Sequence, residues 1–365
     1  MKRDGFVDSM RGIFHIIMLI DHLPIVLASI FSSFMVFYEP LGFVSVAEGF
    51  VFLSGFVSGI VYTRVGREQG RRMVWRKALV RAKDILICYF VAVLALLILA
   101  RWLGVDYLRW GSWGNLAEFS LLSAAAKVAT LLYQPTFLEI LPMYALFLMF
   151  TPIVLAQLEK GNYLETGAMS VLIWIAAQFH IRNVVLSLVP ANTDAGFFDP
   201  FAWQILFVAG LVCGHKTQAS TAPWLSRQRL LLTLAWALAA FLLLLRHRLI
   251  RLPITEAMTS RQFLGFVRLL NFATLTFLIC SNRSVLERLV AWSGFGFLSR
   301  HSLQVFAFHL VPLCFARLAL ATRTSAPAWL QILVAVLCVV SLFQIAFFAK
   351  LWKDGLAYIA VKWNA

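Results

Sequence analysis

The stretch ILICYFVAVLALLILA, from Ile85 to Ala100, decides the fold class of this chain. It carries no charged residue, and it lacks the alternation of polar and apolar residues that is typical of a membrane β-strand. A helix needs about 20 mostly apolar residues to cross a bilayer, and the run approaches this length when it is continued to Leu103. The pattern predicts a membrane-spanning helix over Ile85–Leu103.

The composition of the whole chain agrees with this stretch. Of the 365 residues, 61% are hydrophobic and 13% are charged, whereas a soluble domain has about 25% charged residues. The mean hydropathy of +0.83 is too high for polar groups to cover the surface. These values exclude soluble, disordered and secreted disulfide-rich proteins. They predict an all-α, polytopic integral membrane protein.

Further apolar runs bring the expected number of membrane spans to about ten. These runs are Ile13–Phe31, Phe43–Tyr62, Phe137–Leu158, Ala168–Leu186, Phe198–Gly214, Leu230–Leu245, Phe263–Cys280, Ser302–Leu320 and Trp329–Phe348. The first run resembles a signal peptide, but Asp21 and His22 interrupt it, and we expect a retained helix. No linker divides the runs, so we expect a single transmembrane domain over residues 1–365.

Basic residues set the expected orientation. The chain holds 32 Lys and Arg against 17 Asp and Glu, a net charge of +15. They lie between apolar runs, which indicates orientation in a membrane rather than a nucleic-acid partner. The strongest cluster, residues 64–83, predicts that this loop and both termini are cytoplasmic. The outside loop Arg246–Arg261 either attracts an anionic substrate or is an orientation cost that other loops outweigh, and we favour the second interpretation.

The cysteines all fall inside apolar runs and lack metal-like spacing, which favours small core residues. They are Cys88, Cys213, Cys280, Cys314 and Cys338. The sequence also lacks a glycine-rich phosphate loop, zinc-type His/Cys spacing and a Ser-His-Asp order. We therefore expect no metal.

The first predicted helix carries an unusual polar face. Arg11, His15 and His22 follow at helical spacing, which places His22 about 16 Å above Arg11 on one face. Ionisable residues within a bilayer are costly, so each is a hypothesis of function. A neutral histidine at that depth can take a proton from an alcohol and return it. The alternative is a histidine satisfied by a neighbouring helix; the aligned set, with Asp21 beside His22, favours catalysis.

The second predicted helix contains one carboxylate and a stripe of small residues. A carboxylate at Glu48 can orient His22 or bind a sugar hydroxyl; the alternative is that it simply reaches the water outside. The small residues predict close packing against another helix. They are Ser54, Gly55, Ser58 and Gly59.

Other polar residues lie in or beside the remaining runs. They are Glu139 and Tyr144, then Asp199, Trp203 and Gln204, then Arg268 and Asn271, and finally Arg300, His301, Gln304 and His309. Arg268 lies within an expected span, so it requires a partner or an anion. Trp203 at a span end is also typical of an interfacial belt.

Several of these residues stand in motifs of a known family. Arg11 and His22 bracket ten residues, which resembles the Arg-x10-His signature of the integral-membrane acyltransferase type 3 superfamily. Ordered stretches more narrowly resemble the OpgC family. They are Asp8–Gly12, Asp21–His22, Glu48–Gly55, Gln134–Pro135 with Leu138–Tyr144, Asp199–Gln204 and Ser299–Phe306. Glu139 and Asp199 depart from the family pattern, in which we expect Asp and Asn.

OpgC proteins are multi-pass enzymes of the bacterial inner membrane that add succinyl groups to osmoregulated periplasmic glucans. The resemblance implies the same activity here, with a glucan acceptor and an acyl-CoA donor. We expect this donor to be succinyl-CoA. It implies that His22 is the general base, that Asp21 or Glu48 orients its ring, and that Arg11 holds the donor. The other candidates for donor or substrate binding are His15, Glu139, Tyr144, Trp203, Gln204, Arg268, Arg300 and His301.

Two other interpretations remain open from the sequence. Intramembrane charges are also typical of a transporter or flippase for a glycan or an anionic metabolite. A membrane scaffold would use polar residues only to hold its helices together, which leaves the alignment of Arg11 and His22 unexplained. Even within the enzyme hypothesis, the acyl group can be succinyl, acetyl or another small acid.

Overall fold

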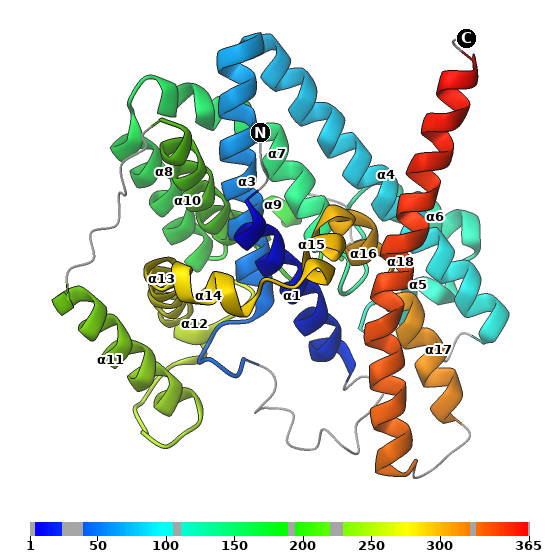
Figure 1. Ribbon diagram of the computed structural model, residues 1–365. Coiled ribbons are helices and arrows are strands. Elements are labelled where there is room, and N and C mark those ends of the chain that lie inside the picture. Colours follow the sequence, from blue (N-terminus) through cyan, green and yellow to red (C-terminus); the bar gives the residue numbers. More distant parts are fainter. Residues whose placement is uncertain are drawn as a thin grey trace. The chain divides into compact units, whose positions relative to one another are not determined.

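The computed structural model describes residues 4–23, 39–104, 111–188, 194–219, 229–321 and 326–363. Over these residues the chain is helical, and the only β-type pairing is an isolated bridge between Tyr133 and Asp194 (Figure 1). The predicted all-α class is therefore confirmed. The chain divides into two compact units.

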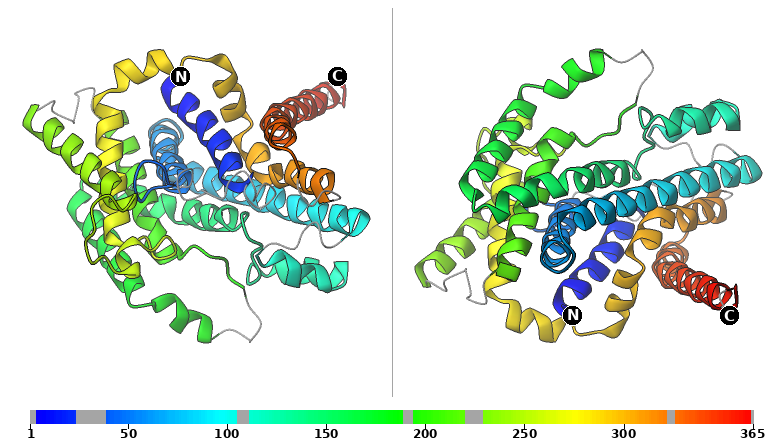
Figure 2. Two further views of the ribbon diagram at one scale, coloured as in Figure 1. Left: turned by 90° about the horizontal axis from the view of Figure 1, so that it is seen from below. Right: turned by 90° about the horizontal axis from the view of Figure 1, so that it is seen from above.

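The first unit is drawn from Met1–Phe34, Phe90–Leu121 and Ser284–Ala365. Its helices are α1 (Gly5–His22), the last part of α4 (Arg71–Leu103), α5 (Trp113–Glu118), most of α14 (Arg283–Leu289), α15 (Ser293–Arg300), α16 (Ser302–Phe308), α17 (Leu310–Ala321) and α18 (Ala328–Trp363). Helix α1 begins after Asp4, whose carboxylate accepts hydrogen bonds from the first free backbone N–H groups. It packs closely on α15 (Figure 2), because Gly12 has no Cβ to overlap the carbonyl oxygen of Phe295.

The second unit is drawn from Met35–Tyr89 and Leu122–Arg283. Its helices are α3 (Val46–Gln69), the first part of α4, α6 (Leu121–Ala129), α7 (Ile140–Glu159), α8 (Tyr163–Gln178), α9 (Ile181–Ser187), α10 (Pro200–Ala219), α11 (Arg229–Arg246), α12 (Glu256–Thr259) and α13 (Phe266–Ser281). Helices α3 and α10 lie side by side (Figure 1). Gly55 and Gly59 of α3 each face a backbone carbonyl of α10 so closely that a Cβ would overlap it. The predicted close packing of this small-residue stripe is confirmed.

Within the described residues, six helices are long and apolar enough to cross a membrane, or eight if each of two bent pairs is one span. These eight correspond to eight of the ten expected spans, so a multi-pass membrane protein is confirmed. The expected span Ile13–Phe31 runs into residues 24–38, which lie outside the described residues. Helix α10 covers the expected span Phe198–Gly214 from Pro200 onward, but it contains Gln204, His215 and Lys216, which lower its hydropathy. The total of ten membrane spans and the cytoplasmic location of both termini remain predictions.

The cysteines are only partly the core residues that the sequence predicts. Cys314 and Cys338 are buried, Cys88 and Cys213 are half-buried, and Cys280 is exposed. The prediction is wrong for Cys280, whose side chain is exposed on α13.

Candidate active site

The polar face of α1 meets a second polar stripe within the first unit. Ser299 at the end of α15 donates a hydrogen bond to Asp8 Oδ1 over 2.9 Å. Ser302, at the start of α16, lies 3.3 Å from Arg11 Nη2 and 2.8 Å from His15 Nε2. His15 is fully buried. The helical spacing predicted from the sequence therefore places Arg11 and His15 on one surface, and a single hydroxyl contacts both.

His22 ends α1, and its ring contacts the ring of a second histidine. His22 Nδ1 lies 2.9 Å from His309 Nε2, and the two ring centroids are 5.0 Å apart. The other nitrogen of His309, Nδ1, lies 2.5 Å from the backbone carbonyl oxygen of Phe306. His309 has no exposed surface. Two histidines and a carbonyl group thus form one chain of hydrogen bonds.

A break in the helical path places His309 at this position. Helix α16 ends at Phe308 and α17 begins at Leu310. Pro312 lies in the first turn of α17 and lacks the N–H that would bond to the carbonyl oxygen of Phe308. The interruption at His309 therefore has a local cause in the sequence, and it lets a side chain bond to the carbonyl of Phe306.

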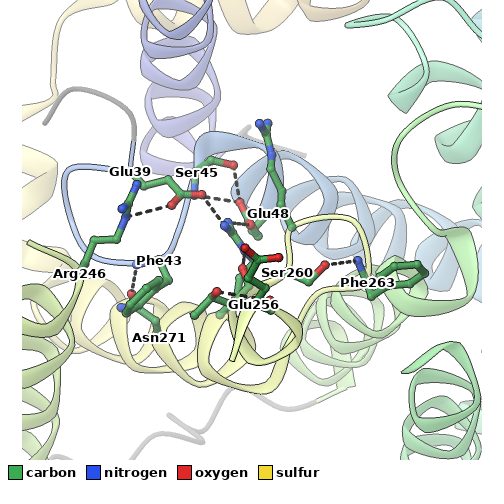
Figure 3. Close-up of polar contacts among 12 residues, drawn as sticks. Glu39, Phe43, Ser45, Glu48, Arg246, Glu256, Ser260, Phe263 and Asn271 are labelled. Atoms are coloured by element: carbon green, nitrogen blue, oxygen red, sulfur yellow. Dashed lines mark hydrogen bonds and ion pairs between the residues drawn. The ribbon is translucent and has the colours of Figure 1, made fainter. Parts of the chain in front are cut away.

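A separate charged cluster lies in the second unit. Arg268 on α13 donates hydrogen bonds to Glu48 Oε1, over 2.7 Å, and to Glu39 Oε1. Arg246 at the end of α11 forms an ion pair with the other oxygen of Glu39 over 3.2 Å, as Figure 3 shows. The second oxygen of Glu48 accepts from both the backbone N–H and the hydroxyl of Ser45. These two glutamates and two arginines balance in charge.

This cluster answers two questions that the sequence left open. Glu48 has no exposed surface, so the alternative in which it reaches outside water is wrong. Arg268 has the partner that an intramembrane arginine requires. Arg246, at the start of the basic loop Arg246–Arg261, pairs with a carboxylate of the same chain. Asn271, one turn from Arg268, accepts a 2.6 Å hydrogen bond from the backbone N–H of Phe43 (Figure 3).

A third polar group lies elsewhere in the second unit, around the start of α10. Asp199 Oδ1 accepts from two backbone N–H groups of the first turn of α10, and Arg182 donates to the carbonyl oxygens of residues 196–198. Glu139, just before α7, is buried. Among the described residues, Glu139 Oε2 and Asp199 Oδ2 have no hydrogen-bond partner. Both carboxylates therefore keep a buried oxygen that can accept from a ligand.

Other predicted site residues have partners within the protein. Trp203 is fully buried and its indole N–H donates to the carbonyl oxygens of Arg261 and Gln262, so it is not an interfacial residue. Gln204 exchanges hydrogen bonds with Ser170 and ties α10 to α8. Both side chains hold the start of α10 in place.

The remaining predicted residues lie apart from these contacts. Tyr144 is half-buried on α7 beside the ring of Phe207, and Arg300 is exposed above the ring of Phe297. Asp21 is half-buried on α1 next to His22. His301 is buried, and burial lowers its pKa below the usual value, with the positive charges of Lys353 and Arg300 lowering it further.

Sequence reasoning named His309 without assigning it a role, and it missed several other partners. Ser302 repeats after Ser299 at helical spacing, as Asp8 and Arg11 do, so that signal was present in the sequence. Arg182 was also visible, as an arginine within the apolar run Ala168–Leu186. Glu39 carried no comparable signal, because it lies in a connection before α3 without helical periodicity.

A cavity of about 550 Å³ lies within the second unit, away from the predicted residues. Arg67, Arg71, Tyr163 and His215 contribute to its wall, and Glu159 pairs with Arg71 over 3.2 Å. Among the described residues, no three His, Cys, Asp or Glu side chains gather as a metal site. The cavity therefore adds no predicted site residue to the three polar groups described above.

The fold and the polar stripe define a class of protein: an all-helical, multi-pass membrane protein with Arg and His aligned along one helix face. The chain belongs to the OpgC family, because the family model described as OpgC protein matches residues 3–354, nearly the whole chain. Membership of this family implies an acyltransferase that modifies glucans. No curated protein and no solved structure shows significant similarity to the chain.

Proposed function

We propose that the chain transfers a succinyl group from cytoplasmic acyl-CoA to hydroxyl groups of periplasmic glucans, with His22 as the general base. The contact that supports this proposal best is the hydrogen bond between His22 Nδ1 and His309 Nε2. This bond holds the imidazole in one orientation through Nδ1. The other ring nitrogen is then the one that would take the proton, as a general base requires. The location of the reaction in a bacterial inner membrane is part of the same proposal.

The proposed step balances without an additional reagent. His22 takes the proton of a glucan hydroxyl, and the hydroxyl oxygen attacks the thioester carbonyl carbon. The carbon–sulfur bond then breaks, the succinyl group remains on the glucan as an ester, and the thiolate of coenzyme A leaves. His22 returns its proton to that thiolate. Holding both reactants against one base supplies much of the rate through proximity.

The three polar groups support different parts of this proposal. Arg11 carries a positive charge on the same face as His22, which suits the anionic donor. Asp21, the sequence neighbour of His22, is the remaining candidate for tuning the base. Glu139 keeps a buried carboxylate oxygen that can accept from a sugar hydroxyl. His15, Arg300, His301 and Tyr144 remain candidates for donor or acceptor contacts.

Glu48 and Arg268 are weaker candidates for the reaction. The carboxylate of Glu48 already binds Arg268 and Ser45, and the charge of Arg268 is balanced by two glutamates. A free succinyl carboxylate would have to displace one of them. We therefore assign these two residues a structural role in the proposed enzyme.

The experiment is mass spectrometry of periplasmic glucans from cells that lack the gene. They are complemented with the wild-type chain, with His22→Ala or with His247→Ala, which replaces a partly exposed histidine near Pro40. Immunoblots of the membrane fraction match expression. We expect a succinyl-sized mass increase with wild type and His247→Ala, and none with His22→Ala.

The other outcomes decide between the alternatives. Equal modification by all three chains would show that His22 is structural. A different added mass would keep the acyltransferase but replace the succinyl group. An unmodified glucan with the wild-type chain would contradict the proposal and favour the transport of a glycan or anionic metabolite.

A further inference from the structure

We propose that His309 is a positioning residue that fixes which ring nitrogen of His22 carries a proton. It holds the proton of neutral His22 on Nδ1, so that the lone pair of His22 is on Nε2. This inference rests on the function proposed above, in which His22 is the base, and it names the atom that acts. It also makes His309 part of the site, a role that sequence reasoning did not give it.

The direction of the hydrogen bonds carries the argument. The carbonyl oxygen of Phe306 can only accept, so His309 Nδ1, at 2.5 Å, must carry a hydrogen and donate it. A neutral imidazole has one N–H, so Nε2 of His309 has a lone pair and accepts. His22 Nδ1, at 2.9 Å from that nitrogen, must then be the donor. The lone pair of neutral His22 consequently lies on Nε2.

The burial of His309 keeps this direction fixed. The reverse direction would require a doubly protonated, cationic His309 that donates from both nitrogens. His309 has no exposed surface, and among the described residues no carboxylate lies within ion-pair distance of its ring. A buried charge without a counter-charge is strongly disfavoured. His309 therefore stays neutral and acts as an acceptor toward His22.

The contact of His15 differs, because its partner does not fix which ring nitrogen carries the proton. His15 Nε2 lies 2.8 Å from the hydroxyl of Ser302, and a hydroxyl can donate or accept. That contact is compatible with either tautomer of His15. The pair of His22 and His309 instead ends in a backbone carbonyl that cannot donate, so the backbone dictates the tautomer there.

The same bonds serve the protonated state of His22. When His22 takes a proton at Nε2, its Nδ1–H remains bonded to the lone pair of His309. The positive charge that develops is then stabilised by a bond that already exists, and His309 neither gains nor loses a proton. No hydrogen bond has to rearrange during the transfer, which is the benefit of a preorganised base.

Two amide substitutions separate the two contacts of His309. The amide of Gln reaches about as far as Nε2 of a histidine, whereas the amide of Asn reaches about as far as Nδ1. In His309→Gln the amide still contacts His22 Nδ1 and orients the ring, but it can donate or accept and so does not fix the tautomer. In His309→Asn the amide N–H still reaches the carbonyl of Phe306, but the partner of His22 is lost. The two variants have similar polarity, and His247→Asn controls for the substitution itself.

The first readout is the tautomer, which does not depend on activity. The full-length chain is labelled with ¹⁵N-histidine in lipid nanodiscs, and the signals of His22 among the seven histidines are assigned by their loss in His22→Ala. We expect the proton on Nδ1 in wild type, and a mixture of tautomers in His309→Asn and in His309→Gln, because neither amide relays the direction set by the carbonyl of Phe306. A proton on Nε2 in wild type, or an unchanged tautomer in His309→Asn, would overturn the inference.

The second readout is the rate of acyl transfer per folded protein. Loss of a partner that orients a reactive group commonly costs about 10- to 100-fold, and we expect a loss of this order in His309→Asn but not in His309→Gln or His247→Asn. Equal rates in the Asn and Gln variants would show that His309 only packs against His22. If wild type transfers no acyl group, the proposed function fails, and the tautomer measurement still decides the role of His309.

Discussion

The guanidinium of Arg268 lies between the carboxylates of Glu39 and Glu48, and all three side chains are buried. A buried ion pair gains little over an apolar pair of the same shape, because desolvation opposes the attraction. Removing one partner is different, since it leaves the other charge buried alone. The cluster is therefore sensitive to single changes even where its net contribution is small.

Arg268→Met should lower the free energy of unfolding by about 3–5 kcal/mol, because two carboxylates lose their shared counter-charge. The measurement is thermal unfolding in detergent, with Arg251→Met as the control at an exposed position. Similar losses in the two variants would contradict the stabilising role. Transfer activity per folded Arg268→Met protein tests separately whether Arg268 also contacts the donor.

At the scale of elements, α3 and α10 pack through glycines from both helices. Gly210 of α10 faces the carbonyl oxygen of Phe52, and Gly214 faces that of Phe56, with Gly55 and Gly59 making the reciprocal approach from α3. Backbone atoms cannot move aside as a flexible side chain can. A single methyl group at this contact must push the helices apart.

Gly210→Ala and Gly167→Ala are the same chemical change, but we expect them to change the free energy of unfolding in opposite directions. Gly167 lies within α8 with nothing within 4 Å of a Cβ, so alanine there raises helix stability by up to about 1 kcal/mol. Gly210→Ala should instead lower the free energy of unfolding by about 1–3 kcal/mol through overpacking. Unfolding by denaturant in mixed micelles measures both. A stabilised Gly210→Ala protein would mean that the two helices are not in close contact.

At the scale of the whole molecule, the number of spans sets the side of each loop. Eight of the ten expected spans have candidate helices among the described residues. The total number of spans depends on whether Ile13–Phe31 and Phe198–Gly214 also cross the membrane. With the basic loop 64–83 inside, ten spans place the C-terminus inside. Eight spans, without these two, place it outside. The side of the C-terminus therefore distinguishes the two arrangements.

We expect a green fluorescent protein fused after Ala365 or after Thr217 to fluoresce, and alkaline phosphatase at either position to be inactive. Fusions after Pro253 should show the reverse, because ten spans put that loop outside. An active phosphatase at Ala365, with a silent one in the loop 64–83, would show that Phe198–Gly214 does not cross the membrane and would contradict ten spans. Membrane-fraction immunoblots control for the amount of each fusion.

Much of the fold and part of the site could be predicted from the sequence. The apolar runs predicted eight candidate membrane helices because length and hydropathy are local properties of a segment. Helical periodicity likewise predicted that Arg11, His15 and His22 share a face. It also predicted the small-residue stripe of α3. In each case the relevant residues lie within a few turns of one another.

The partners of those residues were decided by the tertiary structure. Ser302 and His309 each lie 287 residues beyond the α1 histidine that they contact, and Glu39 lies 229 residues before Arg268. Periodicity within a segment carries no information about such distances. The sequence by itself therefore determined the helices and the faces they present, whereas packing decided which polar groups meet, because a buried donor or acceptor is satisfied only by the groups that the packed helices bring to it.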